Sequence, residues 1–219
     1  NYKLLVSDMR IFIDSANVDE ITKAFQTGLI DGVTTNPTLI KKSERDPSSV
    51  YRELEVLGVK DISMEVMGTE YEMIEEALKL SEEFDDVATI KLPMTQDGLK
   101  VCRYLNGYNI RTNVTLIFNA AQALLAAKAG ATYVSPFVGR IDDQGYAGLE
   151  VVRSIAGLYA QNGQSTQVLA ASIRTPHRAV RSFFNGASIV TMPPKVFWDM
   201  YNHVLTDVGL EIFERDANG

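Results

Sequence analysis

Short apolar segments alternate with amphipathic segments along almost the whole chain. Apolar residues that run together predict buried strands, and apolar residues spaced three and four apart predict helices. Strands are predicted at residues 11–16, 32–37, 61–67, 87–94, 110–117, 133–138, 167–173 and 188–192. A predicted helix follows each strand, at residues 17–27, 48–57, 69–84, 96–105, 120–129, 148–161, 176–184 and from 194 onward. The chain is therefore a regular series of strand–helix units.

This series indicates an α/β fold with a parallel sheet, because parallel strands are joined by helical crossovers. Eight units, spaced about 25 residues apart, favour closure into a (β/α)8 TIM barrel. An open doubly wound sheet is the alternative, but no glycine-rich phosphate loop follows any predicted strand. We expect residues 1–219 to form a single barrel domain, with one additional C-terminal helix at residues 206–216.

Composition and charge narrow the possible partners. The 219 residues are 46% hydrophobic, which suffices for one sizeable core, and the net charge of −7 argues against nucleic acid or an anionic membrane as a partner. The single cysteine, Cys102, cannot form an internal disulfide, which fits a reducing compartment. Residues 1–9 are interpreted as an N-terminal extension, and they lack the layout of a signal peptide. These features predict a cytoplasmic protein.

One predicted strand contains a lysine, in the run Val-Ala-Thr-Ile-Lys-Leu-Pro at residues 87–93. Strand side chains alternate, so Thr89 and Lys91 share one face and Ile90 and Leu92 share the other. Burial of an ammonium is costly and favours the neutral amine, the nucleophile that forms a Schiff base with a carbonyl substrate. A lysine that extends to the surface from the end of its strand is the alternative.

Polar residues also lie at the ends of the other strands, which in a TIM barrel form the active site. Several are two residues apart, a spacing that in a strand directs both side chains the same way. The pairs are Thr34 with Asn36, Ser63 with Glu65, Asn113 with Thr115, and Ser172 with Arg174, and Asp14 ends the first strand. Each taken alone has an ordinary explanation as a helix cap or a turn residue. Together they predict a polar site around Lys91, because buried polar groups need partners or a ligand.

Five motifs, in this order, resemble those of the transaldolase family, and in particular of its short single-domain branch. They are Asp14, Gly-Val-Thr-Thr-Asn-Pro at 32–37, Ile-Lys-Leu-Pro at 90–93, Ser-Pro-Phe-Val-Gly-Arg at 135–140 and Ala-Ser-Ile-Arg at 171–174. The resemblance implies a Schiff-base enzyme of the pentose phosphate pathway that transfers a dihydroxyacetone unit between sugar phosphates. The donors would be sedoheptulose 7-phosphate or fructose 6-phosphate, and the acceptors glyceraldehyde 3-phosphate or erythrose 4-phosphate.

The resemblance also implies a role for each site residue. Lys91 would form the Schiff base, Glu65 with Thr115 would move protons through a water, and Asp14 would exchange the proton of the C4 hydroxyl. The implied binding residues are Thr34, Asn36, Asn113, Ser135 and Phe137 for the sugar, and Arg140, Ser172 and Arg174 for its phosphate. No cofactor or metal is implied, because the lysine is itself the electron sink. The implied assembly is a homo-oligomer, a pentamer or decamer, in which C-terminal helices lie across neighbouring copies.

Two alternatives remain open. The nearer is a fructose 6-phosphate aldolase, which uses the same lysine but releases free dihydroxyacetone. Relatives of that kind have glutamine at the position of Glu65 and tyrosine at the position of Phe137, so both residues here resemble the transferases. The second is a non-catalytic barrel that binds sugar phosphates. The intact set of Lys91, Asp14 and Glu65 argues against it.

Overall fold

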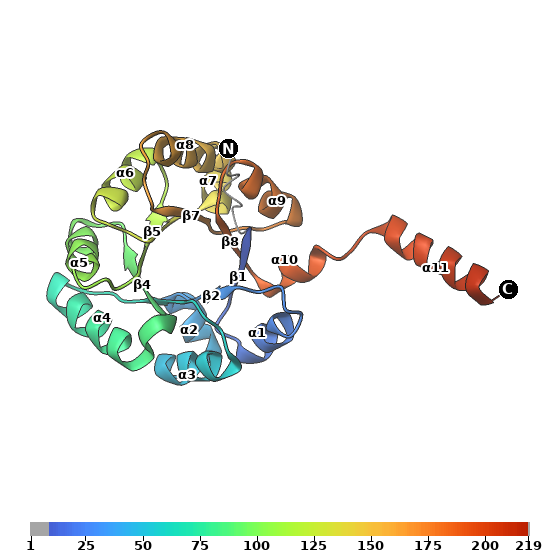
Figure 1. Ribbon diagram of the computed structural model, residues 1–219, viewed down its shortest axis with the longest axis horizontal. Coiled ribbons are helices and arrows are strands. Elements are labelled where there is room, and N and C mark those ends of the chain that lie inside the picture. Colours follow the sequence, from blue (N-terminus) through green and yellow to red (C-terminus); the bar gives the residue numbers. More distant parts are fainter. Residues whose placement is uncertain (1–8, 219) are drawn as a thin grey trace, which may run out of the picture.

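The computed structural model describes residues 9–218 and shows a closed barrel of parallel strands surrounded by helices (Figure 1). Strand order around the barrel follows the chain, and β8 closes the barrel against β1. The strands are β1 (Arg10–Asp14), β2 (Gly32–Thr34), β3 (Ile62–Glu65), β4 (Ala88–Pro93), β5 (Thr112–Ile117), β6 (Tyr133–Pro136), β7 (Gln167–Ala170) and β8 (Ile189–Met192). The predicted TIM barrel is confirmed.

Most helices match the predicted ones, but two short ones, α2 and α7, were not predicted. The helices are α1 (Val18–Phe25), α2 (Pro37–Ser43), α3 (Pro47–Leu57), α4 (Glu70–Phe84), α5 (Gln96–Asn106), α6 (Ala120–Lys128), α7 (Val138–Asp143), α8 (Gly148–Gln161), α9 (Pro176–Phe184), α10 (Pro194–Asp199) and α11 (Val204–Asn218). The prediction of a strand through residue 37 is wrong, because Asn36 caps α2 by accepting the amide hydrogen of Leu39 at 3.0 Å. Pro37 fits the first turn of that helix, where its missing amide hydrogen costs nothing.

Side chains on the two faces of the strands build two different interiors. Outward-facing residues such as Ile13, Met64 and Ile90 are fully buried in the main apolar core together with residues of the helices. A smaller apolar cluster is separate from that core and consists of Phe12, Tyr133, Leu169, Ala171 and Ile189. This cluster comes from β1 and from β6 to β8. On β2 to β5, the buried side chains that alternate with the apolar core residues are polar, and this polar side of the barrel includes Lys91.

Gly32 on β2 makes room for the aromatic ring of Phe12. A Cβ atom at Gly32 would lie 2.6 Å from the ring of Phe12 and 2.7 Å from the carbonyl oxygen of Asp61, closer than real Cβ contacts allow. The glycine of the Gly-Val-Thr-Thr-Asn-Pro motif therefore serves packing rather than chemistry.

The last helix, α11, extends away from the barrel (Figure 1), and none of its residues is buried. It includes the predicted residues 206–216 and exposes the apolar side chains Val204, Leu205, Val208, Leu210, Ile212 and Phe213. Among residues 9–218, no helix has the length and apolar character needed to cross a membrane. The extension predicted at residues 1–9 lies outside the described residues except for Met9.

Candidate active site

Strand register places Lys91 in a row of polar side chains. Lys91 on β4 is level with Glu65 on β3 and with Asn113 on β5. Residues at one level of neighbouring parallel strands point to the same side of the sheet. Lys91 is only 4% exposed, so the alternative in which it extends to the surface is wrong.

The ammonium of Lys91 has two partners. Its Nζ lies 2.9 Å from a carboxylate oxygen of Glu65 and donates a hydrogen bond of 2.9 Å to the carbonyl oxygen of Thr35. Both charged side chains are nearly buried, and removal of one partner from such a pair destabilises a protein by about 3–5 kcal/mol, because the other charge is left buried without compensation. At this separation a proton can pass directly from the ammonium to the carboxylate, which leaves a neutral amine.

Asp14, at the end of β1, brings a second carboxyl group to the site. The hydroxyl of Thr34 donates a hydrogen bond of 2.8 Å to its carboxylate and lies 2.7 Å from the hydroxyl of Thr191. Desolvation raises the pKa of Asp14, and the positive charge of Lys91 and the hydrogen bond from Thr34 offset part of that rise. A carboxyl group with a raised pKa beside a buried amine suits proton transfer.

A chain of hydrogen bonds fixes the amide of Asn113. Ser135 donates to its carbonyl oxygen at 2.7 Å, and its amide nitrogen donates to the hydroxyl of Ser63 at 3.1 Å. All three side chains are buried. The buried hydroxyl of Thr115, in contrast, has no hydrogen-bond partner among residues 9–218. A buried orphan hydroxyl beside a polar cavity calls for a water or a ligand atom.

These groups surround a cavity of about 110 Å³ at the carboxyl ends of the strands. Most of the predicted site residues line it, and the full lining is Asp14, Thr34, Asn36, Lys91, Thr115, Ser135, Phe137, Arg140, Ala171, Ser172 and Thr191. Three predicted residues, Glu65, Asn113 and Arg174, do not line it. Asn113 is fully buried beside Lys91. Glu65 contacts a separate cavity of about 420 Å³ between α2, α3 and α4, so the Lys91–Glu65 pair lies between two cavities.

Arg140 lies at the rim of the smaller cavity. Its guanidinium lies over the ring of Phe137, with 5.1 Å between Cζ and the ring centroid, and the ring of Phe118 packs against Phe137 at 5.8 Å. Within residues 9–218, no carboxylate forms an ion pair with Arg140. A stacked guanidinium without an anionic partner is well suited to bind an anionic ligand.

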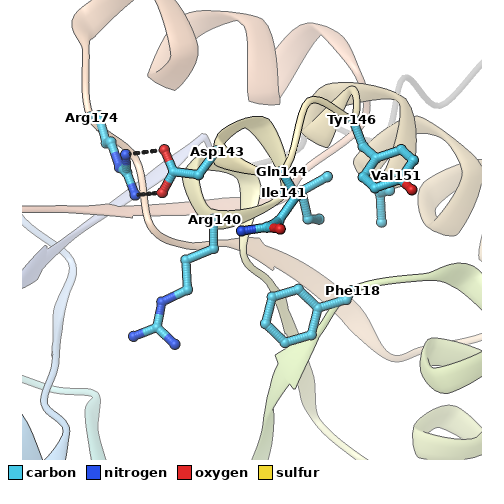
Figure 2. Close-up of a pocket in the computed structure, with 8 residues that line it drawn as sticks. All are labelled: Phe118, Arg140, Ile141, Asp143, Gln144, Tyr146, Val151 and Arg174. Atoms are coloured by element: carbon cyan, nitrogen blue, oxygen red, sulfur yellow. Dashed lines mark hydrogen bonds and ion pairs between the residues drawn. The ribbon is translucent and has the colours of Figure 1, made fainter.

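Arg174 is placed differently from what the sequence predicts. β7 ends at Ala170, and Ser172 has a left-handed backbone with φ of 57°, so Ser172 and Arg174 do not form a strand pair. Arg174 instead lines an adjoining cavity of about 740 Å³, to which Arg140 also contributes. Its two terminal nitrogens both donate to the carboxylate of Asp143, and Arg140 extends away from that pair (Figure 2).

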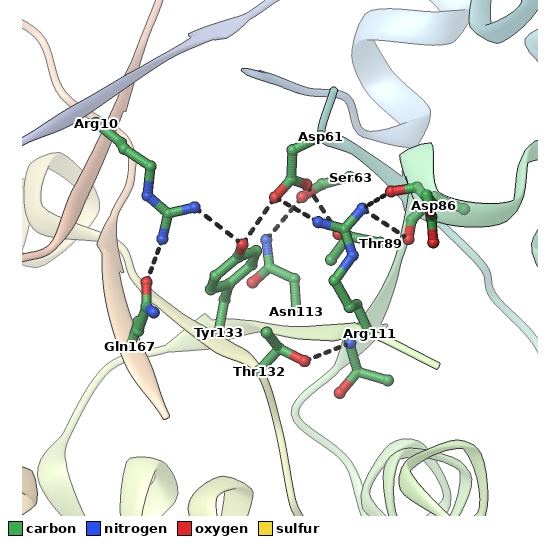
Figure 3. A network of polar contacts seen from close by, with 12 residues as sticks. Arg10, Asp61, Ser63, Asp86, Thr89, Arg111, Asn113, Thr132, Tyr133 and Gln167 are labelled. Carbon is green, nitrogen blue, oxygen red and sulfur yellow. Dashed lines mark hydrogen bonds and ion pairs between the residues drawn. The ribbon is translucent and has the colours of Figure 1, made fainter. Parts of the chain in front are cut away.

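A further polar network lies nearer the amino ends of the strands and does not line the small cavity (Figure 3). Asp61 is 5% exposed and accepts hydrogen bonds from Thr89 at 2.8 Å, from the hydroxyl of Tyr133 at 2.7 Å and from Arg111 at 3.1 Å. Arg10 donates a further bond to the hydroxyl of Tyr133. Groups at this end of a TIM barrel serve stability, and here the network satisfies a buried carboxylate.

Several residues of the site were not predicted, and four of them make contacts described above. Thr191 lies two positions after Ile189 on β8, so both side chains point to the same side of the sheet. The alternation of side chains that was used for the other strands was therefore sufficient to find Thr191. Thr35 contributes only its backbone carbonyl oxygen, which every residue has, so the sequence does not single it out. Phe118 and Asp143 lie after the strands, where no strand periodicity applies.

Comparison with known proteins finds relatives that span almost the whole chain. Residues 11–218 match the family model described as Transaldolase/Fructose-6-phosphate aldolase. A protein of Thermodesulfovibrio yellowstonii named probable transaldolase is 48% identical over 95% of this chain and 97% of its own length. Proteins with the same name from Clostridium botulinum and Clostridioides difficile are 49% and 48% identical, over 95% and 96% of this chain and 96% and 98% of theirs.

Proposed function

This chain belongs to the transaldolase/fructose-6-phosphate aldolase family, and we propose that it is a cytoplasmic transaldolase of the pentose phosphate pathway. Family membership makes it an enzyme of the transaldolase or aldolase kind. In our proposal it takes a dihydroxyacetone unit from sedoheptulose 7-phosphate or fructose 6-phosphate and passes it to glyceraldehyde 3-phosphate or erythrose 4-phosphate.

The observation that carries the proposal is the buried amine of Lys91 in contact with a proton acceptor. Glu65, at 2.9 Å, takes the proton of the ammonium, and the neutral amine attacks the C2 carbonyl of the donor sugar. Protonation of the resulting carbinolamine hydroxyl releases water and forms an iminium. We assign that water to the site beside Thr115, whose buried hydroxyl has no protein partner.

Asp14 serves the cleavage and transfer steps. Its carboxylate takes the proton of the C4 hydroxyl as the C3–C4 bond breaks, and the bonding electrons flow into the iminium to give an enamine. The first aldehyde then leaves. The enamine attacks the carbonyl of the acceptor aldehyde, Asp14 returns the proton to the new hydroxyl, and hydrolysis of the iminium frees Lys91. The raised pKa of Asp14 fits a group that both accepts and returns a proton.

The sizes of the cavities support a sugar phosphate that extends across the mouth of the barrel. The cavity at Lys91, about 110 Å³, has room for several waters, which suits a three-carbon unit. The remainder of the sugar phosphate has to extend past Arg140 toward the adjoining cavity of about 740 Å³, where Arg174 lies. Arginine pairs readily with phosphate, so the two guanidiniums are the natural phosphate ligands.

Two residues favour the transferase over the aldolase. Glu65 and Phe137 both match the transferases of this family rather than the aldolases. The phenyl ring of Phe137 lines the cavity with Lys91 and offers no hydrogen-bond donor or acceptor. The enamine therefore meets no phenolic proton donor there and persists until an acceptor aldehyde arrives.

Trapping the covalent intermediate tests the proposal. Borohydride reduction in the presence of fructose 6-phosphate should inactivate the protein and add one three-carbon unit to Lys91, as located by peptide mass spectrometry. Lys91→Met should remove both the adduct and the activity, whereas Lys100→Ala, at an exposed lysine on α5, should keep both. A coupled assay with and without erythrose 4-phosphate then compares transfer with release of dihydroxyacetone. An adduct on another lysine, or activity without an adduct, contradicts the Schiff-base role.

A further inference from the structure

The two arginines assigned to the phosphate are held in place by different means. Arg140 lies against the ring of Phe137 and has no carboxylate partner among the described residues. The Arg174 side chain is 53% exposed and rests in a two-point ion pair with Asp143 (Figure 2). Asp143 is the last residue of α7, the helix that also carries Arg140. One short helix thus carries a phosphate ligand directly and a partner of the second ligand.

The ion pair leaves one edge of the Arg174 guanidinium free. The contact with Asp143 uses Nη1 and Nη2, and a guanidinium has five N–H donors, so the edge that contains Nε keeps its hydrogens available. The backbone of α7 shows where that edge lies. A Cβ atom placed on Gly139 would be 2.8 Å from Nε of Arg174 and 3.1 Å from the hydroxyl oxygen of Ser172.

Nε of Arg174 and the hydroxyl of Ser172 therefore both lie beside Gly139 of α7. Ser172 lines the cavity that holds Lys91, and the amide of Gly139 donates a hydrogen bond of 3.0 Å to its carbonyl oxygen. This bond fixes the segment from Ser172 to Arg174 against α7. The Nε edge of Arg174 therefore lies on the same side as Ser172, a residue of that cavity, and the other edge is paired with Asp143.

We propose that Asp143 is a positioning residue, which holds Arg174 so that its Nε edge and the Ser172 hydroxyl face the phosphate of the bound sugar phosphate. This inference rests on the proposed function. An exposed arginine samples many rotamers, and ordering it on binding costs affinity unless it is ordered beforehand. Asp143 provides that order. The negative charge of Asp143 also repels a phosphate. If that repulsion were the larger effect, removal of Asp143 would lower KM for the sugar phosphate instead of raising it.

The test measures KM and kcat for fructose 6-phosphate with erythrose 4-phosphate in the native protein and in Asp143→Ala. We expect KM to rise about two- to fivefold with kcat retained, the size typical of an exposed charge pair. Asp143→Glu should restore most of the loss, because a carboxylate is again present. In the Arg174→Ala background the same substitution should have no further effect, since the residue that Asp143 positions is gone.

Two controls isolate the effect. Glu150→Ala removes the same charge from the first turn of α8, where Glu150 pairs with Arg153 and not with Arg174, and it should leave KM unchanged. Borohydride capture of dihydroxyacetone, which carries no phosphate, should proceed at the native rate in Asp143→Ala. An unchanged or lower KM in Asp143→Ala, or an equal loss with dihydroxyacetone, overturns the positioning role. If the native protein forms no lysine adduct with fructose 6-phosphate, the proposed function itself fails.

Discussion

Phe137→Tyr tests how the protein controls the fate of the three-carbon unit after cleavage. Phe137 follows β6, and its ring lines the cavity of about 110 Å³ together with Lys91. The ring also contacts Arg140 at 5.1 Å and Phe118 at 5.8 Å, and Phe137 packs against the small apolar cluster inside the barrel, so the ring is held in place. Tyrosine has nearly the same shape, and the substitution therefore adds a hydroxyl while the packing of the ring is kept.

The expected change is an increase in release of dihydroxyacetone relative to transfer. Release requires that the enamine on Lys91 is protonated and the iminium hydrolysed before an acceptor aldehyde arrives. A phenolic hydroxyl can donate a proton or order a water, which phenylalanine cannot. One hydrogen bond is worth about 0.5–1.5 kcal/mol, so a single new bond in the protonation step should change the ratio about 2- to 13-fold.

The assay compares two products from fructose 6-phosphate. Dihydroxyacetone release is measured without acceptor, and formation of sedoheptulose 7-phosphate is measured with erythrose 4-phosphate. Phe118→Tyr is the matched control, because the Phe118 ring lines the cavity of about 740 Å³ and not the one with Lys91. An unchanged ratio in Phe137→Tyr refutes the reasoning about residue 137. If the native protein cleaves fructose 6-phosphate equally well without acceptor, the transaldolase proposal is wrong.

Two further predictions concern proton transfer and assembly. Thr34→Val removes a hydrogen bond that lowers the pKa of Asp14 against the effect of burial, so this pKa should rise. Asp14 must be ionised to act as the base, and the acid limb of the pH profile of kcat/KM should therefore move to higher pH; a limb that stays in place or moves down contradicts this. None of the apolar side chains of α11 is buried by residues 9–218, and we propose that they bind neighbouring copies in a pentamer or decamer. Truncation after Thr206 should lower the mass seen by light scattering, and an unchanged mass refutes this role of the helix.

The fold was predictable because each strand and the main helix after it carry their own signal, whereas the short helices α2 and α7 do not. Short apolar runs alternate with segments in which apolar residues are three and four apart, and this pattern identified the eight strand–helix units. A parallel barrel is the closed arrangement of eight such units. The errors lie at strand ends, where the predicted strands run up to three residues too far. Asn36 shows the reason, since a side-chain cap and a following proline start a helix where the polar pattern alone still fits a strand.

The candidate site was predictable where it is built from strands and not where it is built from the segments after them. The alternation rule placed Lys91 inside the barrel, and register then puts Glu65 and Asn113 on either side of it. Arg174 follows a residue with a left-handed backbone, and its partner Asp143 comes from a helix that was not predicted. A contact between two such segments depends on tertiary structure, so the sequence pattern contains no signal for it.

The family resemblance implies that residues 65 and 137 differ together between the transferases and the aldolases, and the ion pair of Lys91 with Glu65 gives a physical reason for such a difference. In the proposed mechanism the amine becomes nucleophilic when its proton passes to Glu65, whose carboxylate oxygen lies 2.9 Å from Nζ, and the protonated Glu65 can then donate to the carbinolamine hydroxyl. A glutamine at residue 65 can accept a hydrogen bond but cannot take up a proton. An enzyme with glutamine there needs its acid–base group on another side of the lysine, and residue 137 lines the cavity with Lys91. We infer that the pair Glu65 and Phe137 keeps proton transfer at the glutamate and away from the enamine, which is the condition for transfer rather than release.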